Sequence, residues 1–352
     1  MKQCLFSILI PVFNTGKVLS RCLDSILKQS CRDFEIILVD DASTDDSLQI
    51  AKKYAKQDSR LKVIALSENS GRDNARLTAI KAASGHYIIF CDSDDELLPD
   101  FLKRAAKYAE TDSDIIVFGR THVSGDLVSP SFRRQMRTWT LKHQQILKGK
   151  EILRAFFLEK KFPCALWGKC IKAKILQYYT PLEIGNCTGS DFLRMIQLLF
   201  HAETLLYVRD QGYVYYYGAG IWGRKTYTLS QIQVFANGYR IYSEAEHFLK
   251  ENNLPAEYFS MLKMYQEENL TEVLRMSTCL PNKALEDGQK MLYDIWGEKL
   301  YFHVLSQYLA RAEKQYSESL SWKITRPLRW MYDFLLYNTG IKNIRANRQK
   351  FE

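Results

Sequence analysis

The chain has 352 residues, of which 46% are hydrophobic and 25% are charged, so it has enough apolar side chains for a globular core. Its eight cysteines form no CxxC pair and no Cys/His metal spacing, which argues against a zinc site and favours buried free thiols in a reducing cytosol. The net charge of +9 comes mainly from the end of the chain, and no run of 18 apolar residues is present that would span a membrane.

Residues 1–120 alternate between strand-length apolar runs and helical patterns. The predicted strands are FSILIPV (6–12), FEIILVD (34–40), LKVIAL (61–66), HYIIFC (86–91) and DIIVFG (114–119). The predicted helices cover residues 18–29, 47–57, 72–84 and 101–110. The strands are continuously apolar, which is typical of a parallel sheet covered on both faces. The pattern therefore predicts an α/β fold with a Rossmann-like, doubly wound, mostly parallel sheet, whose ligands bind beyond the carboxyl ends of the strands.

Acidic residues follow two of these strands, at the edge where a ligand is expected. Asp40 and Asp41 follow the second apolar run, and the fourth leads into DSDDE at residues 92–96. Four carboxylates within five positions repel one another unless a cation or a basic partner neutralises them. Mg²⁺ and Mn²⁺ are bound by one or two carboxylates together with phosphate oxygens, so a metal-dependent phosphate ligand is one interpretation. A solvated surface loop is the other.

Beyond residue 120 the pattern loosens. It predicts a helix at 149–160, a second helix starting near Asp191, and two short strands at 205–209 and 213–217. From about residue 230 the chain is predicted to be helical almost to its end, which makes the C-terminal region a helical extension.

Four segments together resemble the family 2 glycosyltransferases of the GT-A fold: IPVFN, FEIILVDDASTDDS, NSGRDNAR and SGHYIIFCDSDDELLP. They occur in the order and with the spacing of the family, and the resemblance covers roughly residues 5–220. It implies an inverting transfer of a sugar from a nucleotide-sugar, usually a UDP-sugar, to an acceptor hydroxyl, with Mn²⁺ or Mg²⁺ as cofactor. We therefore expect a GT-A catalytic domain over 1–225, with a nucleotide-binding half (1–120) and an acceptor half (121–225), and a helical region over 226–352.

The resemblance also implies the residues that bind the donor. The nucleotide-binding residues are Pro11, Phe13, Asp40, Asp41, Arg72, Arg76, Asp92 and Ser93. The first two of these wall the nucleobase pocket, Asp41 holds the uracil with Asp40 as a second candidate, and the arginines approach the base or the diphosphate. Asp92 contacts the ribose, and Asp94 ligates the metal. The two arginines, four residues apart on a helix, fit a solvated helix face equally well.

An inverting transfer also needs a general base that takes the proton of the acceptor hydroxyl. The family places an Asp, normally preceded by Glu, at a helix start near the end of the catalytic domain. The matching segment here is GSDFLRM, which makes Asp191 the base and puts Ser190 where Glu is expected. The loss of the Glu affects the positioning of the acceptor more than the base itself. Alternatively, Asp191 is a charge that the helix dipole favours at an N-terminus.

The end of the chain is basic and aromatic. Between Trp322 and Lys350 there are seven basic residues and one acid, beside several aromatic side chains. This composition favours either an anionic membrane surface or a helix packed on the core. Similar tails occur in family members that build bacterial surface polysaccharides. We therefore predict a lipid-linked glycan acceptor and a cytoplasmic enzyme that is peripheral on the inner face of the plasma membrane.

The expected partners are a nucleotide-sugar donor and a glycan acceptor, and not a nucleic acid. The transfer is expected to be non-processive and to move a hexosyl or N-acetylhexosaminyl group, because processive relatives carry membrane helices and a Gln-x-x-Arg-Trp motif that this chain lacks. Two rival functions stay open. A nucleotidyltransferase should have a Gly-rich basic loop after the first strand, where PVFNTGKVLSRC has one Gly. A non-catalytic nucleotide-sugar-binding protein on the same fold is favoured if Asp191 is dispensable.

Overall fold

The computed structural model describes residues 4–124, 144–182, 187–217 and 227–317. The chain divides into two compact units, one made of residues 1–225 and 237–265 and the other of residues 226–236 and 266–352. The basic tail predicted to bind a membrane falls at 318–352 and lies outside the described residues.

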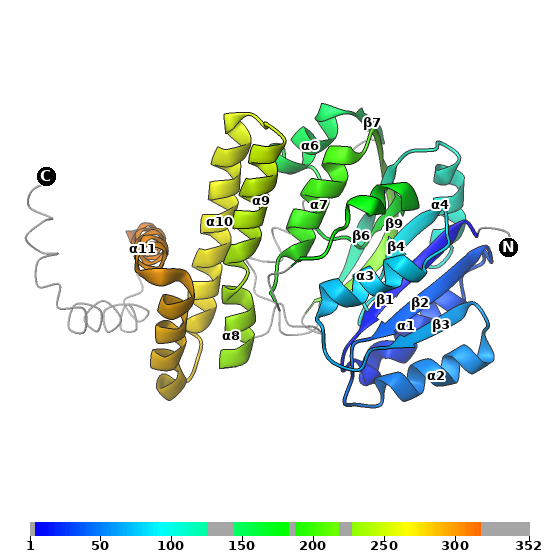
Figure 1. The fold of residues 1–352 in the computed structure, drawn as a ribbon, viewed down its shortest axis with the longest axis horizontal. Helices are drawn as coiled ribbons and strands as arrows, with labels where there is room; N and C mark the ends of the chain where they lie inside the picture. The colour runs from blue at the N-terminus through cyan, green and yellow to red at the C-terminus, as the bar shows by residue number, and fades with distance from the viewer. Residues whose placement is uncertain (1–3, 125–143, 183–186, 218–226, 318–352) are drawn as a thin grey trace, which may run out of the picture. The chain divides into compact units, whose positions relative to one another are not determined.

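Figure 1 shows the strands and helices of the described residues. The strands are β1 (Phe6–Val12), β2 (Phe34–Asp40), β3 (Leu61–Ala65), β4 (Tyr87–Phe90), β5 (Glu96–Leu97), β6 (Ile115–Ser124), β7 (Gln145–Lys148), β8 (Lys169–Lys172) and β9 (Thr204–Tyr217). The helices are α1 (Gly16–Leu27), α2 (Ser47–Gln57), α3 (Arg72–Ala82), α4 (Phe101–Ala109), α6 (Lys150–Phe157), the 3₁₀ helix η1 (Ala173–Tyr178), α7 (Ser190–His201), α8 (Leu229–Ala236), α9 (Tyr239–Glu251), α10 (Ala256–Ser277) and α11 (Asn282–Ser317).

The strands of the first unit form one sheet in the order β3-β2-β1-β4-β8-β6-β9-β5, with β7 paired to β9. Strands β3, β2, β1 and β4 are parallel, so the carboxyl ends of β1, β2 and β4 lie at one edge. Strand β8 runs antiparallel to both β4 and β6, while β6 and β9 are parallel. The predicted fold class is therefore confirmed, and the antiparallel pairs all involve strands that follow β4.

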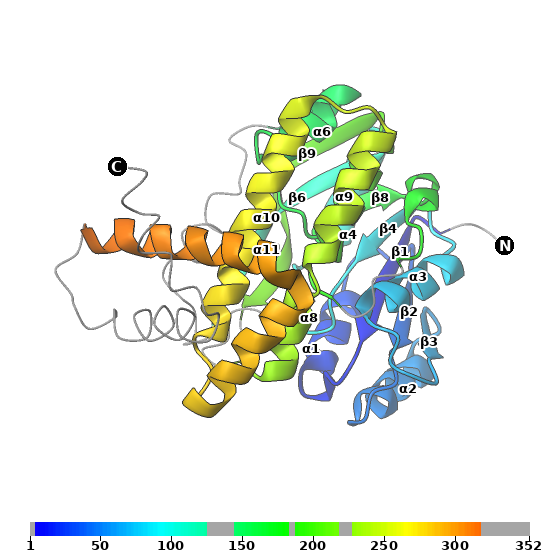
Figure 2. The same cartoon turned by 60° about the vertical axis from the view of Figure 1, so that its left-hand side comes forward.

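Successive residues of the parallel strands pack into two different cores, one on each face of the sheet. In β1, Leu9 contacts the core formed with α3, α6, α7 and α9, whereas Ile8 and Ile10 contact the core formed with α1, α2 and α4. Figure 2 shows α3 across the face of β1 and β2, where Ala75 and Ala79 are fully buried. This two-sided burial explains why the strands are apolar at every position rather than at alternate ones.

Strand β9 differs from the prediction of two short strands at 205–209 and 213–217. It is continuous, and its pairing with β6 shifts register beside Gly119. At Gly212, between the two predicted strands, a Cβ would lie 2.3 Å from the ring of Phe101. The glycine is therefore required by close packing of α4 on the strand. Between the pairs Val117–Tyr207 and Arg120–Tyr213, β9 advances by more residues than β6, so the pairing there is irregular.

The second unit is helical in its described part. The indole Nε1 of Trp296 in α11 donates to the carbonyl of Ala236 in α8 at 3.0 Å. Helix α11 is kinked at Gly297, whose φ of +73° and ψ of 163° are accessible only to glycine. Among the described residues, no helix is both long enough and apolar enough to cross a membrane.

A buried carboxylate connects strands β1, β2 and β3 at the edge of the sheet opposite to the acidic loop. Glu35 accepts hydrogen bonds from Ser7 Oγ at 2.7 Å, from the Ser84 N–H at 2.6 Å and from Lys62 Nζ at 2.8 Å. Burial opposes its ionisation, but Lys62, Ser7 and Ser84 outweigh burial and lower the pKa of Glu35 to about 2.

We expect Glu35→Gln to destabilise the protein at pH 7 by at most about 3 kcal/mol, which is the full free-energy equivalent of the pKa shift before solvent screening. Because the folded pKa lies below the unfolded value of 4.5, this stabilisation is complete above pH 4.5 and is lost as the pH falls toward 2. Urea unfolding at pH 7 and at pH 3.5 measures the loss, with the exposed Glu68→Gln as control. An equal loss at both pH values would contradict a charge-based contribution.

Candidate active site

The acidic loop after β4 is neutralised largely by side chains of the chain itself. Asp92 accepts a hydrogen bond from Arg76 Nη2 at 2.8 Å. Asp95 accepts from the Tyr213 hydroxyl at 2.7 Å and from the Tyr216 N–H at 2.9 Å. Glu96 accepts from the Tyr216 hydroxyl at 2.5 Å. Three of the four carboxylates therefore have partners on α3 or on β9.

Asp94 differs from the other three acids. Its backbone carbonyl accepts a hydrogen bond from Arg21 Nη2 at 2.6 Å, but no side chain in the described part of the chain donates to its carboxylate. Burial, followed by the charge of Asp92, raises the pKa of Asp94 to about 6. Burial together with Asp94 and Asp92 raises the pKa of Asp95 further, to about 9. The loop therefore presents one carboxylate to which no described side chain donates a hydrogen bond, although the charges of Arg72 and Arg21 partly offset the rise in its pKa.

This arrangement fits a divalent cation only in part. A carboxylate oxygen is a suitable ligand for Mg²⁺ or Mn²⁺, and the environment of Asp94 disfavours its charge unless a cation is near. Within the described ranges, however, no group of three or more His, Cys, Asp or Glu side chains is arranged to hold a metal. A cation at Asp94 therefore requires further oxygens from a ligand or from water.

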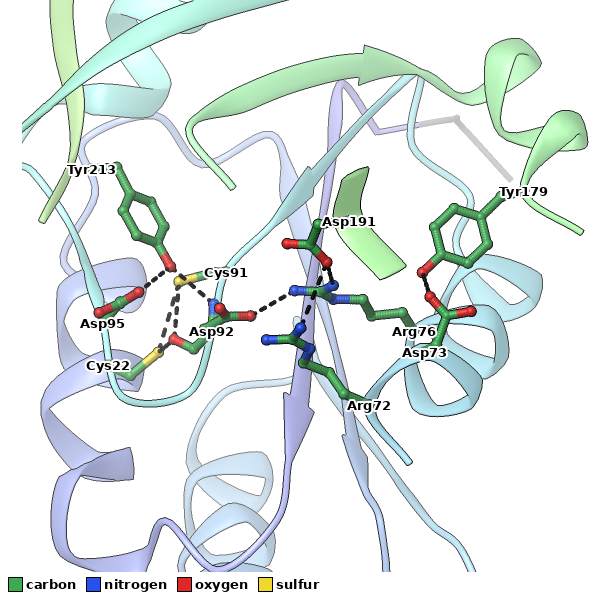
Figure 3. A network of polar contacts seen from close by, with 10 residues as sticks. All are labelled: Cys22, Arg72, Asp73, Arg76, Cys91, Asp92, Asp95, Tyr179, Asp191 and Tyr213. Atoms are coloured by element: carbon green, nitrogen blue, oxygen red, sulfur yellow. Dashed lines mark hydrogen bonds and ion pairs between the residues drawn. The ribbon is translucent and has the colours of Figure 1, made fainter. Parts of the chain in front are cut away.

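Arg76 lies at the centre of a network that joins three elements (Figure 3). Its side chain is completely buried, and its Nη1 donates to Asp191 Oδ1 at 2.6 Å while its Nη2 donates to Asp92. Arg72, one turn earlier on α3, is 43% exposed and lies 3.7 Å from Asp191 Oδ1. The structure therefore brings together Arg72, Arg76, Asp92 and Asp191, which the sequence separates by up to 119 positions.

Asp191 is in the first turn of α7, directly after Gly189 and Ser190. Gly189 has a φ of +91°, which suits glycine and lets the chain turn sharply into the helix. Burial raises the pKa of Asp191, but the charges of Arg76 and Arg72 outweigh burial, so the pKa is lowered overall. Since its side chain is 15% exposed, Asp191 is an ionised carboxylate that retains some access to solvent.

The residues expected around a nucleobase are found at the ends of β1 and β2. Phe13 is 46% exposed, whereas Pro11 is buried within β1. Both oxygens of Asp41 accept hydrogen bonds from residues 70 and 71, with Ser70 N–H at 2.8 Å and Gly71 N–H at 2.9 Å. By contrast, Asp40 Oδ2 accepts from the Ser43 N–H, and its Oδ1 is buried without a partner in the described structure. Ser93 is 5% exposed.

Sequence reasoning missed three residues of this region: Arg21, Tyr213 and Tyr216. The Nε of Arg21 lies 3.0 Å from Glu96 Oε1 without hydrogen-bond geometry, and its guanidinium lies 3.6 Å from the centre of the Tyr216 ring. A single arginine in an amphipathic helix carries no signal of this role. The tyrosines belong to a visible YVYYY run, but that run indicates a strand and does not identify its partners.

The chain is similar to known glycosyltransferases in sequence and in fold. The family model described as "Glycosyl transferase family 2" matches residues 7–168. The poly(ribitol-phosphate) β-N-acetylglucosaminyltransferase TarS of Staphylococcus aureus (strain Mu50) is 37% identical over 218 residues, which are 60% of this chain and 35% of that protein. The chain thus spans about a third of that relative.

Two solved structures share the fold. The crystal structure of Staphylococcus aureus TarS 1–349 in complex with UDP-GlcNAc has a TM-score of 0.53 and 21% identity, over 87% of this chain and 92% of that chain. The mannosyltransferase PcManGT of Pyrobaculum calidifontis, in complex with GDP-Man and Mn²⁺, has a TM-score of 0.53 and 16% identity, over 89% of this chain and 81% of that chain.

Proposed function

Because the chain belongs to glycosyltransferase family 2 through its residues 7–168, we propose that it is an inverting enzyme that moves a sugar from a UDP-sugar to an acceptor hydroxyl. The observation that carries this proposal is the contact of one buried arginine, Arg76, with both Asp92 and Asp191. This contact joins the end of β4, where the donor binds in such a sheet, to an ionised carboxylate that can accept a proton.

On the donor side, the proposal assigns the exposed ring of Phe13 and the neighbouring Pro11 to the nucleobase. The free Oδ1 of Asp40 can accept a uracil N–H, while Asp41 is already engaged with residues 70 and 71 and orders that loop. Asp92 and Ser93 are assigned to the ribose.

The two arginines of α3 receive different roles. Arg72 is partly exposed and can approach the diphosphate. Arg76 has no exposed surface and both of its terminal nitrogens are engaged, so it holds Asp92 and Asp191 instead of reaching the nucleotide. The burial of Arg76 argues against a solvated helix face for this residue, whereas the exposure of Arg72 is compatible with either alternative.

Asp94 is assigned to a divalent cation, Mn²⁺ or Mg²⁺. The fit rests on its unpartnered carboxylate and on the negative neighbours that disfavour its charge. A bound cation would neutralise the diphosphate leaving group.

Asp191 is assigned as the general base. Its carboxylate takes the proton from the acceptor hydroxyl as the oxygen attacks the anomeric carbon on the face opposite the diphosphate. The bond from that carbon to the phosphate oxygen breaks, and the electron pair leaves with UDP. Because Arg76 stays hydrogen-bonded to Asp191, the carboxylate keeps its orientation during the transfer.

For the acceptor, we propose a lipid-linked glycan in surface polysaccharide synthesis, which receives one hexosyl or N-acetylhexosaminyl group per event. The relative TarS is named for transfer to poly(ribitol-phosphate), which makes that polymer a second acceptor to test. A cytoplasmic position on the inner face of the plasma membrane follows if the basic tail binds anionic lipid.

We expect the full chain, but not a chain ending at Leu320, to float with anionic liposomes. Each basic residue near such a surface contributes about 1 kcal/mol, and seven of them lie between Trp322 and Lys350. Binding should weaken in 1 M salt, where the screening length falls to ~3 Å. Neutral liposomes serve as control. Equal flotation of both chains would show that the tail does not bind membranes.

The function is tested by measuring UDP release from UDP-glucose, UDP-galactose and UDP-GlcNAc, with and without poly(ribitol-phosphate) or a lipid-linked glycan. We expect one donor to release UDP faster when a suitable acceptor is present, and Asp191→Asn to abolish the increase. Release of pyrophosphate from UTP and a sugar phosphate would instead identify a nucleotidyltransferase. Donor binding without turnover, unchanged by Asp191→Asn, would identify a binding protein.

A further inference from the structure

A second ion pair connects the helices that carry Arg76 and Asp191. Arg194 of α7 is completely buried, and its Nη2 donates to Asp73 Oδ2 of α3 at 2.5 Å. The Tyr179 hydroxyl donates to Asp73 Oδ1 at 2.6 Å (Figure 3), and the Arg194 guanidinium lies 4.2 Å from the centre of the Tyr179 ring. This network is adjacent to the proposed base but takes no part in the chemistry described above.

The four charged residues Asp73, Arg76, Asp191 and Arg194 form a reciprocal arrangement, which we call the α3–α7 ion pairs. Each helix contributes one acid and one base three residues apart, which places both on the same helix face. Along α3 the acid precedes the base, and each pairs with the opposite charge on α7. A shift of α7 by one turn along α3 would bring Arg194 against Arg76, or Asp191 against Asp73. The four charges therefore pair favourably in one register of the two helices, whereas the neighbouring registers bring like charges together.

The position of Asp191 depends on side-chain contacts more than that of a mid-helix residue. The N–H groups of the first turn of a helix have no intrahelical partners, so the backbone there is held less firmly. Asp191 lies in this first turn, next to Gly189 with its positive φ. Arg194 lies one turn further into α7, where the backbone hydrogen bonds are complete.

We infer that Asp73 and Arg194 are positioning residues for Asp191, which fix the register of α7 on α3 so that Arg76 can hold the base beside Asp92. This inference rests on the proposed function and adds two residues to it. Misplacement of a catalytic group by about 1 Å can cost on the order of 10²-fold in rate, so the pair should affect turnover although neither residue touches a substrate.

The test uses the full chain with Asp73→Asn, Arg194→Gln and the double variant, and Tyr179→Phe as matched control. Each single variant leaves one buried charge unpaired and can impair folding, whereas the double variant removes both charges. The control removes a hydrogen bond to Asp73 but leaves the ion pair intact. Circular dichroism and thermal melting identify which variants are folded. UDP affinity is measured by calorimetry, and kcat is measured as UDP release from the best donor.

We expect the double variant to lower kcat by about 10- to 100-fold while the UDP affinity stays within about twofold. In the single variants that fold, kcat should fall by about the same factor as in the double variant, because the two residues act as one unit. The acid limb of the pH profile of kcat should move to higher pH, since a displaced Arg76 no longer lowers the pKa of Asp191 as strongly. Tyr179→Phe should change neither kcat nor the profile.

A second group that interacts with Asp191 also titrates: burial lowers the pKa of Lys169 in β8 to about 7. None of the variants replaces Lys169, so its contribution to the pH profile is common to all of them. A lower melting temperature with unchanged kcat and an unchanged pH profile would overturn the inference, because the pair would then only stabilise the fold. If the unmodified protein shows no transfer that depends on Asp191, it is the proposed function that fails instead.

Discussion

Replacing Asp191 by Asn lowers kcat by about 10²–10⁴-fold, while UDP and the donor bind with nearly unchanged affinity. The amide occupies the same space and can still contact Arg76, but it cannot accept the proton of the acceptor hydroxyl. The loss should therefore appear in turnover and not in donor binding. Measurement of kcat and KM for the donor, together with calorimetry of UDP, separates the two effects.

The pH dependence offers a second readout of the same residue. Because Arg76 and Arg72 lower the pKa of Asp191 against the effect of burial, the base stays ionised below the ordinary Asp range. In the unmodified protein the acid limb of kcat should thus lie at lower pH than the titration of an ordinary Asp. Glu151→Gln, a matched change in the first turn of α6, serves as control. A variant Asp191→Asn with normal turnover would refute the role of general base.

We expect chelation of divalent cations to weaken UDP binding by about 10-fold or more, because a cation held by Asp94 would compensate the negative charge of the acidic loop and of the diphosphate. The variant Asp94→Asn should bind UDP with the same low affinity in Mn²⁺ and in chelator. Calorimetry of UDP with the unmodified protein and the variant, each in both solutions, measures these four affinities.

The matched control for this experiment is Asp100→Asn. Asp100 lies six residues further along the chain, is exposed, and has a left-handed backbone conformation that Asn also adopts. Its replacement should leave the cation dependence intact. Equal UDP affinity of the unmodified protein in Mn²⁺ and in chelator would remove Asp94 from the role of metal ligand.

Much of the fold was predictable from the sequence because its strands are buried on both faces. FSILIPV and FEIILVD are apolar at every position, and β1 and β2 occupy the predicted residues. The prediction divided β9 into two strands, whereas the strand is continuous and Gly212 within it is constrained by the ring of Phe101, which lies more than a hundred positions away. Periodicity detects burial along a segment, but it does not detect which distant side chain approaches a backbone.

The candidate residues that the sequence could indicate are those that belong to recognisable motifs. Asp92, Asp94 and Asp191 were identified in this way, and the structure places Asp92 and Asp191 on the same arginine. The burial of Arg76 and the contact of Arg21 with the acidic loop were not predictable. An arginine on a helix faces solvent in most sequences, and only the packing of α3 and α7 determines that Arg76 does not.

The contacts of Asp95 and Glu96 with β9 have a consequence for the order of events during synthesis. Tyr216 follows Glu96 by 120 residues, which at ordinary elongation rates corresponds to about 6–24 s. During this interval β4 is an unpaired edge, because its partner β8 also emerges later, and the loop beyond it carries carboxylates without their phenolic partners. The nascent chain can therefore assemble β1 to β4 early, but the acidic loop gains its contacts with Tyr213 and Tyr216 only after β9 has left the ribosome.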